Sequence, residues 1–368
     1  MSKQKTHTFE SFELESGTVL KEVVLAYRTW GTISTDCDNV IVACHSLTGD
    51  ADVENWWAPL FGSGRTFDPD RNFIICVNLL GSCYGSTGPT SINPESGERY
   101  SGSFPITTIR DNVRAQRRLL DEIGITNVEA AIGSSLGGMI ALEWALFDPS
   151  LKRVIAIATS GRHSAWCIGW SEAQRQAIYA DPNWDNGFYS AASPPQGGLA
   201  AARMMAMLSY RTQSSFKDRF SREIVSEEQA FSVETYLRHQ GKKLIERFDA
   251  NSYVRLSQTC NSHDLSRGRG NYEKVLASIE QDVLVVGIDS DVLFPLAEQQ
   301  ELARHIPNAV LEIIDSTHGH DAFLLEADAL NQIISRWLEP VPDNKPAADI
   351  TLGPHQKAKT VRVHQHAH

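Results

Sequence analysis

One short segment of the chain has the residue types and spacing for covalent catalysis. Gly133-Ser134-Ser135-Leu136-Gly137 fits G-x-S-x-G, a sharp turn that lifts a serine hydroxyl from the end of a strand onto the start of a helix. The apolar run 128–132 precedes this turn, and a helix-like stretch over 136–147 follows it. Glycines two residues to either side relieve crowding in such a strained turn. The pattern predicts that Ser135 is the nucleophile of an acyl-transfer reaction.

An activated serine needs a base, and the base needs an acid to orient it. On this type of fold the three residues follow in the order Ser, Asp or Glu, His. The apolar run 283–288 leads into Asp289 and Asp291, and the run 310–315 leads into His318 and His320. Parallel strands bring their carboxyl ends to one edge of a sheet, so these groups are expected to converge on Ser135. The residues alone allow either aspartate as the acid and either histidine as the base.

The oxyanion of a tetrahedral intermediate needs two backbone amides. One is expected from Leu136, directly after the nucleophile, and the other from the loop after an early strand. His45-Ser46-Leu47-Thr48-Gly49 follows the apolar run 39–44, and Leu47 is the candidate for the second amide. The glycine-rich segment 81–89 lacks the G-K-[ST] ending of a phosphate-binding P-loop, which argues against nucleotide hydrolysis.

Short β-branched runs alternate with helical patterns along much of the chain. A strand pair is expected over 19–30, and buried parallel strands over 39–44, 73–78, 128–132, 153–159, 283–288 and 310–315. Helices are expected over 110–123, 136–147, 296–305 and 322–338. This alternation predicts an α/β fold with a doubly wound, mostly parallel sheet.

The alternation stops between about residues 166 and 274. Helical segments are expected there over 197–210, 226–248 and 250–258, with no convincing buried strand. We therefore predict a core made of residues 1–165 and 275–340, and a helical cap inserted at 166–274. Residues 341–368 have little apolar periodicity and are predicted to be disordered.

Composition narrows the function classes. The 368 residues carry a formal net charge of −11, which disfavours nucleic acid and anionic membranes as partners. No run approaches the roughly 20 apolar residues of a membrane span, and no signal peptide is recognisable. Six cysteines without a C-x-x-C pair suit a reducing cytoplasm, and no metal site is expected beyond a stray ion on tail histidines 364, 366 and 368. Arg267-Gly268-Arg269-Gly270 suits a cap loop facing an anionic acyl donor better than RNA.

Several longer motifs together resemble the homoserine O-acetyltransferase family of the α/β-hydrolase superfamily. The resemblance spans roughly residues 8–338. Its motifs are the segment Asn78–Pro89, Phe104-Pro105 with Thr108–Asp111, the elbow and helix Gly133–Trp144, the cap motif Arg247–Tyr253, Asp291–Pro295 and Gly319–Leu324.

The resemblance implies specific roles. It favours Asp291 as the acid and His320 as the base. It implies that Arg203 binds the acceptor's carboxylate, that Asp321 holds its ammonium group and that Tyr210 lines the same pocket. The implied reaction is a ping-pong transfer from acetyl-CoA, a co-substrate and not a bound cofactor, to the hydroxyl of L-homoserine in methionine biosynthesis. Members of this family are typically homodimers that associate through their caps.

Alternatives stay open at this stage. Succinyl-using relatives tend to carry an arginine soon after the catalytic aspartate, whereas Val292-Leu293 stands here and favours acetyl. Serine as the acceptor differs from homoserine by one methylene, which a pocket distinguishes only modestly. A serine hydrolase would keep the same triad, and a non-catalytic binding protein on this fold is disfavoured because Ser135, Asp291 and His320 are all present.

Overall fold

The computed structural model describes residues 2–225, 229–338 and 359–361. A nine-stranded sheet forms the centre of the core, in the order β1-β2-β4-β3-β5-β6-β9-β10-β11. The five pairings from β4 through β3, β5, β6 and β9 to β10 are parallel, and the pairings at both ends are antiparallel. The strands are β1 (Lys5–Glu13), β2 (Val19–Trp30), β3 (Val40–Cys44), β4 (Phe73–Val77), β5 (Ala130–Ser134), β6 (Arg153–Ile157), β9 (Asp282–Ile288), β10 (Ala309–Ile314) and β11 (Lys359–Val361).

The central strands are buried on both faces, which explains why they are continuous apolar runs. Along β3, for example, Val40, Val42 and Cys44 belong to one hydrophobic cluster, and Ile41 and Ala43 belong to the other. Helices α2 (Ile109–Glu122), α3 (Leu136–Phe147), α9 (Tyr272–Ala277) and α10 (Leu296–His305) contribute to the first cluster, and α1 (Val53–Trp56) and α12 (Ala327–Leu338) to the second. The sheet is therefore the middle layer of a three-layer core.

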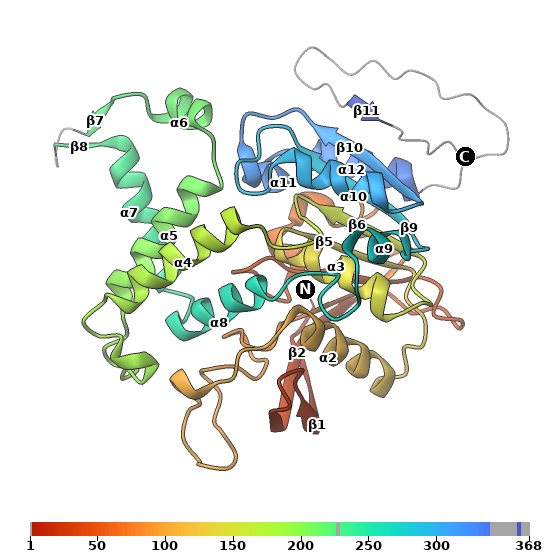
Figure 1. The fold of residues 1–368 in the computed structure, drawn as a ribbon, viewed down its shortest axis with the longest axis horizontal. Coiled ribbons are helices and arrows are strands. Elements are labelled where there is room, and N and C mark those ends of the chain that lie inside the picture. Colours follow the sequence, from red (N-terminus) through yellow and green to blue (C-terminus); the bar gives the residue numbers. More distant parts are fainter. Residues whose placement is uncertain (1, 226–228, 339–358, 362–368) are drawn as a thin grey trace.

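Of the α-helices between β6 and β9, all but α9 lie together to one side of the sheet in Figure 1. They are α4 (Ala165–Tyr179), α5 (Gln196–Ser209), α6 (Gln213–Phe220), α7 (Ser232–Ile245) and α8 (Ala250–Asn261). Helix α5 packs against both α4 and α7, and α8 packs against α4 and α5. This group corresponds to the predicted cap, and its loops reach back to the edge of the sheet that carries the predicted catalytic residues.

Three sequence expectations need correction. The segment 19–30 is not a strand pair but one strand, β2, which pairs with β1 on one side and β4 on the other. The helix expected over 322–338 is divided at Glu326 into α11 (Ala322–Leu325) and α12. The helix expected over 226–248 begins only at Ser232, because the preceding residues form the short strand β8 (Ala230–Phe231), which pairs antiparallel with β7 (Ile224–Val225).

The predicted disordered tail lies mostly outside the described residues. Within it, Lys359–Val361 forms β11, which pairs antiparallel with β10. Disorder is therefore the wrong expectation for these three residues, and it stays a prediction for the others. The register joins Leu311 to Val361 and Ile313 to Lys359, so β11 covers the hydrogen-bonding edge that β10 would otherwise expose.

Candidate active site

The turn at Ser135 has the strained backbone that the G-x-S-x-G pattern predicts. Ser135 has φ 55° and ψ −123°, a conformation that costs a non-glycine residue energy and is held by its surroundings. Its N–H donates to Ile157 O at 2.9 Å, and its carbonyl accepts from Thr159 Oγ1 at 2.9 Å. Helix α3 begins at the next residue, which places Ser135 at the carboxyl end of β5 and at the positive end of a helix.

The expected acid and base meet beyond β9 and β10. His320 Nδ1 lies 2.7 Å from Asp291 Oδ2, and both side chains are buried. The other oxygen, Asp291 Oδ1, accepts the backbone N–H groups of Leu293 and Phe294 at 2.8 and 2.9 Å. A carboxylate accepts but does not donate, so the proton of a neutral His320 stands on Nδ1 and its Nε2 is free to take a proton.

The structure also places the two rival residues. Asp289 is exposed, and its Oδ1 accepts the N–H of Ser316 at 3.0 Å in the loop after β10. His318 is half-buried, and its Nδ1 has no hydrogen-bond partner. Of the four candidates, only Asp291 and His320 form a contact between a carboxylate and an imidazole. Ser135, Asp291 and His320 follow the carboxyl ends of β5, β9 and β10, respectively. These three parallel strands end at the same edge of the sheet.

The loop that carries Leu47 lies directly against this turn. Ser46 Oγ donates to Ser134 O at 2.9 Å, and the Gly49 N–H closes a tight turn on Ser46 O at 2.9 Å. The turn does not use the Leu47 amide. The amide of Leu136, the first residue of α3, has no acceptor within its own helix. Both expected oxyanion donors therefore have free N–H groups beside the elbow.

His45 fixes this loop from inside the core. Its Nε2 accepts the N–H of Leu79 at 3.2 Å, so its ring proton stands on Nδ1, which donates to Ser46 O at 2.9 Å. Burial lowers the pKa of His45, against smaller opposing effects of Ser46 and Asp50, and so favours the neutral ring that this pattern needs. The sequence alone does not indicate this role of His45, because the contact with Leu79 depends on a loop after β4 that is distant along the chain.

Gly137 allows the turn at Ser135 to approach the end of β3, where the loop 45–49 (the oxyanion loop) begins. A Cβ at this position would lie 2.0 Å from Cys44 O and 2.8 Å from Cys44 C, and both are backbone atoms. We expect Gly137→Ala to destabilise the protein by at least about 2 kcal/mol, because backbone must move to admit the methyl group. Urea unfolding measures the change.

The matched control is Gly169→Ala. Gly169 lies on the exposed side of α4, and a Cβ there meets nothing within 4 Å. Alanine in a helix is favoured over glycine by about 0.5–1 kcal/mol, so this variant is expected to be as stable as the parent or slightly more so. Equal unfolding midpoints for both variants would refute the close approach at Gly137.

The three residues that the resemblance assigned to acceptor binding lie together near His320. The ring of Tyr210 is centred 5.6 Å from the imidazole of His320, and the Arg203 guanidinium lies 5.7 Å from the same tyrosine ring. Asp321 follows His320 directly, and its N–H donates to Tyr210 O at 3.0 Å. Burial raises the pKa of Tyr210 to about 12, with Arg203 acting in the opposite direction. Its hydroxyl is therefore protonated at neutral pH.

Asp321 has a resident partner that the sequence did not indicate. Its Oδ2 lies 2.9 Å from Arg211 Nε, and both side chains are largely buried. The contact is an ion pair and not an aligned hydrogen bond, because Arg211 Nε has no partner with hydrogen-bond geometry. Burial raises the pKa of Asp321, while Arg211, His320 and Arg203 lower it. Asp321 is thus paired with Arg211 directly beside His320.

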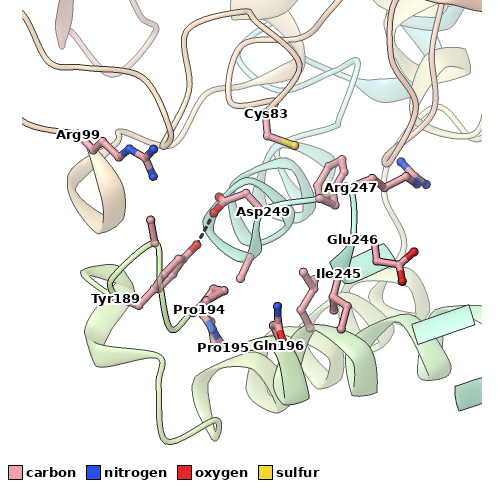
Figure 2. A pocket seen from close by; sticks show the side chains of 14 residues that line it. Cys83, Arg99, Tyr189, Pro194, Pro195, Gln196, Ile245, Glu246, Arg247 and Asp249 are labelled. Atoms are coloured by element: carbon pink, nitrogen blue, oxygen red, sulfur yellow. Dashed lines mark hydrogen bonds between the residues drawn. The ribbon is translucent and has the colours of Figure 1, made fainter. Parts of the chain in front are cut away.

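The arginines of the segment 267–270 pair with carboxylates of the core: Arg267 with Glu15 at 2.7 Å, and Arg269 with the buried Glu143. That this segment faces an acyl donor stays a prediction. Cys83 lies on a cavity of about 320 Å³ that the segments 189–199 and 245–250 also line, and Figure 2 shows this cavity. Burial raises the pKa of the Cys83 thiol to about 11, so it is not a reactive thiolate at neutral pH.

Among residues 2–225, 229–338 and 359–361, no cluster of three or more His, Cys, Asp or Glu side chains is arranged to hold a metal ion. Tail histidines 364, 366 and 368 lie outside these ranges. All six cysteines are free, and Cys44 and Cys76 are buried in the core strands β3 and β4. No helix in the described part of the chain is long and apolar enough to cross a membrane.

Known proteins resemble almost the whole chain in sequence and in fold. The family model for the alpha/beta hydrolase fold matches residues 39–327. The homoserine O-acetyltransferase of Nostoc punctiforme is 56% identical over 331 residues, which cover 88% of this chain and 93% of that protein. The crystal structure of homoserine O-acetyltransferase from Bacillus anthracis superimposes with a TM-score of 0.86 at 25% identity and covers 92% of this chain and 98% of that one. Esterase E22 superimposes with a TM-score of 0.84 at 29% identity and covers 92% of this chain and all of that one.

Proposed function

Because the chain belongs to the homoserine O-acetyltransferase family, we propose that it transfers an acetyl group from acetyl-CoA to the side-chain hydroxyl of L-homoserine through an acyl-enzyme on Ser135. The observation that carries the proposal is the contact of Asp291 with His320 Nδ1, which leaves Nε2 free, on the same sheet edge as the strained Ser135. This is the arrangement that serine acyltransfer requires.

In the first half-reaction His320 Nε2 takes the proton of Ser135 Oγ, and Oγ attacks the thioester carbonyl carbon. The negative charge that develops on the carbonyl oxygen is stabilised by the Leu47 and Leu136 amides. The carbon–sulfur bond then breaks, and His320 returns its proton to the departing thiolate of CoA. Asp291 stabilises the imidazolium throughout and fixes the ring, since its Oδ2 contacts Nδ1 and its Oδ1 is held by two backbone amides.

In the second half-reaction the homoserine hydroxyl gives its proton to His320 and attacks the acetyl carbon. The ester bond to Ser135 breaks, and Ser135 Oγ regains the proton. Arg203 is suited to bind the acceptor's carboxylate, because a guanidinium donates two parallel hydrogen bonds. Asp321 Oδ2 is occupied by Arg211, so the ammonium group would bind at the other oxygen.

The residues after Asp291, in the loop that follows β9 (the acid loop), support acetyl as the transferred group. Leu293 is buried, and its carbonyl accepts from Cys167 Sγ at 3.0 Å, while the Val292 carbonyl accepts from Trp166 Nε1 at 2.7 Å. The residues after Asp291 thus pack against α4 and supply no cation for a second carboxylate. This favours an uncharged acyl group over succinyl.

Product analysis tests the substrates directly. The enzyme is incubated with acetyl-CoA or succinyl-CoA, each combined with homoserine, serine or no acceptor, and the products are identified by mass spectrometry. We expect O-acetylhomoserine as the main product. Succinylated products alone would refute the donor, and acetylserine alone would refute the acceptor. Acetate released at an undiminished rate without any acceptor would favour a hydrolase, the activity that the name of esterase E22 indicates for that protein.

Arg203→Ala is expected to raise KM for homoserine by about 100-fold, because a charge-assisted bidentate contact is worth about 1.5–3 kcal/mol. The rate of Ser135 acetylation by acetyl-CoA should stay within about threefold of the parent, since that step precedes acceptor binding. Stopped-flow release of CoA and steady-state kinetics separate the two quantities. Equal losses in both half-reactions would contradict an acceptor-specific role.

We also propose a cytoplasmic homodimer formed through the cap. Large apolar side chains are exposed on cap segments, among them Phe188, Leu208 and Ile224, and a second copy would cover them. Six unpaired cysteines suit a reducing compartment and support the proposed location.

A further inference from the structure

The turn between α7 and α8 carries an exposed arginine, Arg247, which reaches from the cap to two loops of the core. Arg247 Nη1 donates to Thr48 O at 2.8 Å and to the hydroxyl of Tyr84 at 2.6 Å, and Nη2 lies 3.5 Å from Thr48 Oγ1. Thr48 directly follows Leu47 in the oxyanion loop, and Tyr84 belongs to the glycine-rich segment 81–89. One guanidinium therefore joins the cap to two loops of the core.

The turn that carries Arg247 is itself firmly held. Phe248 is buried, with its ring 5.7 Å from that of Tyr84. Asp249 caps α8 by accepting the Ser252 N–H at 2.8 Å, and it also accepts from the Tyr189 hydroxyl at 2.6 Å. In Figure 2, Asp249 points toward Tyr189, whereas Arg247 points away from it. The Arg247 N–H itself donates to Leu244 O at 3.0 Å, so the backbone that carries the guanidinium is held in place.

The oxyanion loop is held from two directions. On the core side, His45 and the Gly49 N–H both donate to Ser46 O, which fixes the start of the turn. On the cap side, Arg247 donates to Thr48 O, which fixes its far half. Leu47 lies between these two points, so the direction of its amide depends on both. Small errors in the direction of an oxyanion donor are costly, because its contribution depends on fixed geometry.

We propose that Arg247 is a positioning residue for acyl transfer, which aims the Leu47 amide by holding Thr48 and so makes oxyanion stabilisation depend on the placement of the cap. The inference rests on the proposed function, because it assumes an acyl-enzyme at Ser135. Each half-reaction forms its own tetrahedral oxyanion at the same pair of amides, so Arg247 should matter equally in both.

The test compares two acyl donors in stopped-flow acylation of the full-length enzyme. Acetyl-CoA is large and anionic, and p-nitrophenyl acetate is small and uncharged. We expect Arg247→Ala to slow acylation by both donors by the same factor, about 10- to 100-fold, with KM for homoserine unchanged. Arg247→Lys keeps one donor to Thr48 O and should recover part of the rate. Tyr84→Phe removes one partner but leaves Thr48 held, and should stay within about twofold of the parent.

Three results would overturn the inference. A loss with acetyl-CoA alone would mean that Arg247 binds the donor. Unchanged acylation in both Arg247→Ala and Arg247→Lys would mean that the link is not needed. A loss in Arg247→Lys that tracks a lowered Tm would mean that the residue is merely structural. The reaction with p-nitrophenyl acetate does not depend on the natural donor or acceptor, so an error in the proposed substrates would leave this test intact.

Discussion

Ser135→Ala lowers kcat for acetyl transfer by about 10⁴- to 10⁶-fold and removes the burst of CoA release, according to the mechanism proposed above. Loss of the nucleophile leaves only binding and the oxyanion amides to act on the thioester. The backbone of the elbow is held by Ile157 and Thr159 through main-chain atoms of residue 135, which the substitution keeps. The fold should therefore survive, as circular dichroism and thermal unfolding would show.

The neighbouring hydroxyl supplies the control. Ser134 is fully buried at the end of β5, and its Oγ lies 3.1 Å from Ser46 Oγ. Ser134→Ala leaves the bond from Ser46 Oγ to Ser134 O in place, so we expect less than about a tenfold loss of kcat. A residual burst in Ser135→Ala, or an equal collapse in Ser134→Ala, would show that the wrong hydroxyl has been assigned.

Asp291→Asn is expected to lower kcat by about 10⁴-fold with little loss of stability. The asparagine oxygen can still accept the N–H groups of Leu293 and Phe294 at the position of Oδ1. Its amide group would then face His320 Nδ1 and donate to it, which moves the ring proton to Nε2. That tautomer cannot accept the proton of Ser135. Steady-state kinetics and urea unfolding measure the two effects.

Asp289→Asn is the matched control, because it makes the same chemical change two residues earlier. Asp289 Oδ1 accepts the Ser316 N–H, and asparagine retains that oxygen. We expect kcat within about threefold of the parent. Comparable losses in both variants would mean that the acid loop, and not the carboxylate at 291, is what catalysis requires.

The sequence was sufficient for the elbow and for the strand ends, because both depend on local patterns. The glycines at 133 and 137, an apolar run before Ser135 and a helical run after it predict one strand, one turn and one helix, and α3 has the predicted bounds. The carboxylates and histidines after β9 and β10 were likewise found by position. Choosing Asp291 over Asp289 required either the family resemblance or the structure, since both aspartates lie in the same short loop.

What escaped prediction depends on contacts between distant segments. Arg247 and Thr48 are 199 residues apart, and nothing in either local sequence indicates that they meet. Arg211 can pair with Asp321 only because the residues after α5 pack against the loop that carries His320, where the Asp321 N–H donates to Tyr210 O. The division of α11 from α12 at Glu326 was hidden because the apolar pattern continues across it. Tertiary packing decides such features, and periodicity does not report them.

Acylation in the absence of acceptor is the most direct test of a covalent mechanism at Ser135. The enzyme is mixed with acetyl-CoA alone, quenched and digested, and the peptides are examined by mass spectrometry while released CoA is counted. One equivalent of CoA should appear in a burst, one acetyl group should be found on Ser135, and homoserine should discharge it as O-acetylhomoserine. CoA release that begins only when homoserine is added, or an acetyl group on any other residue, would contradict the account.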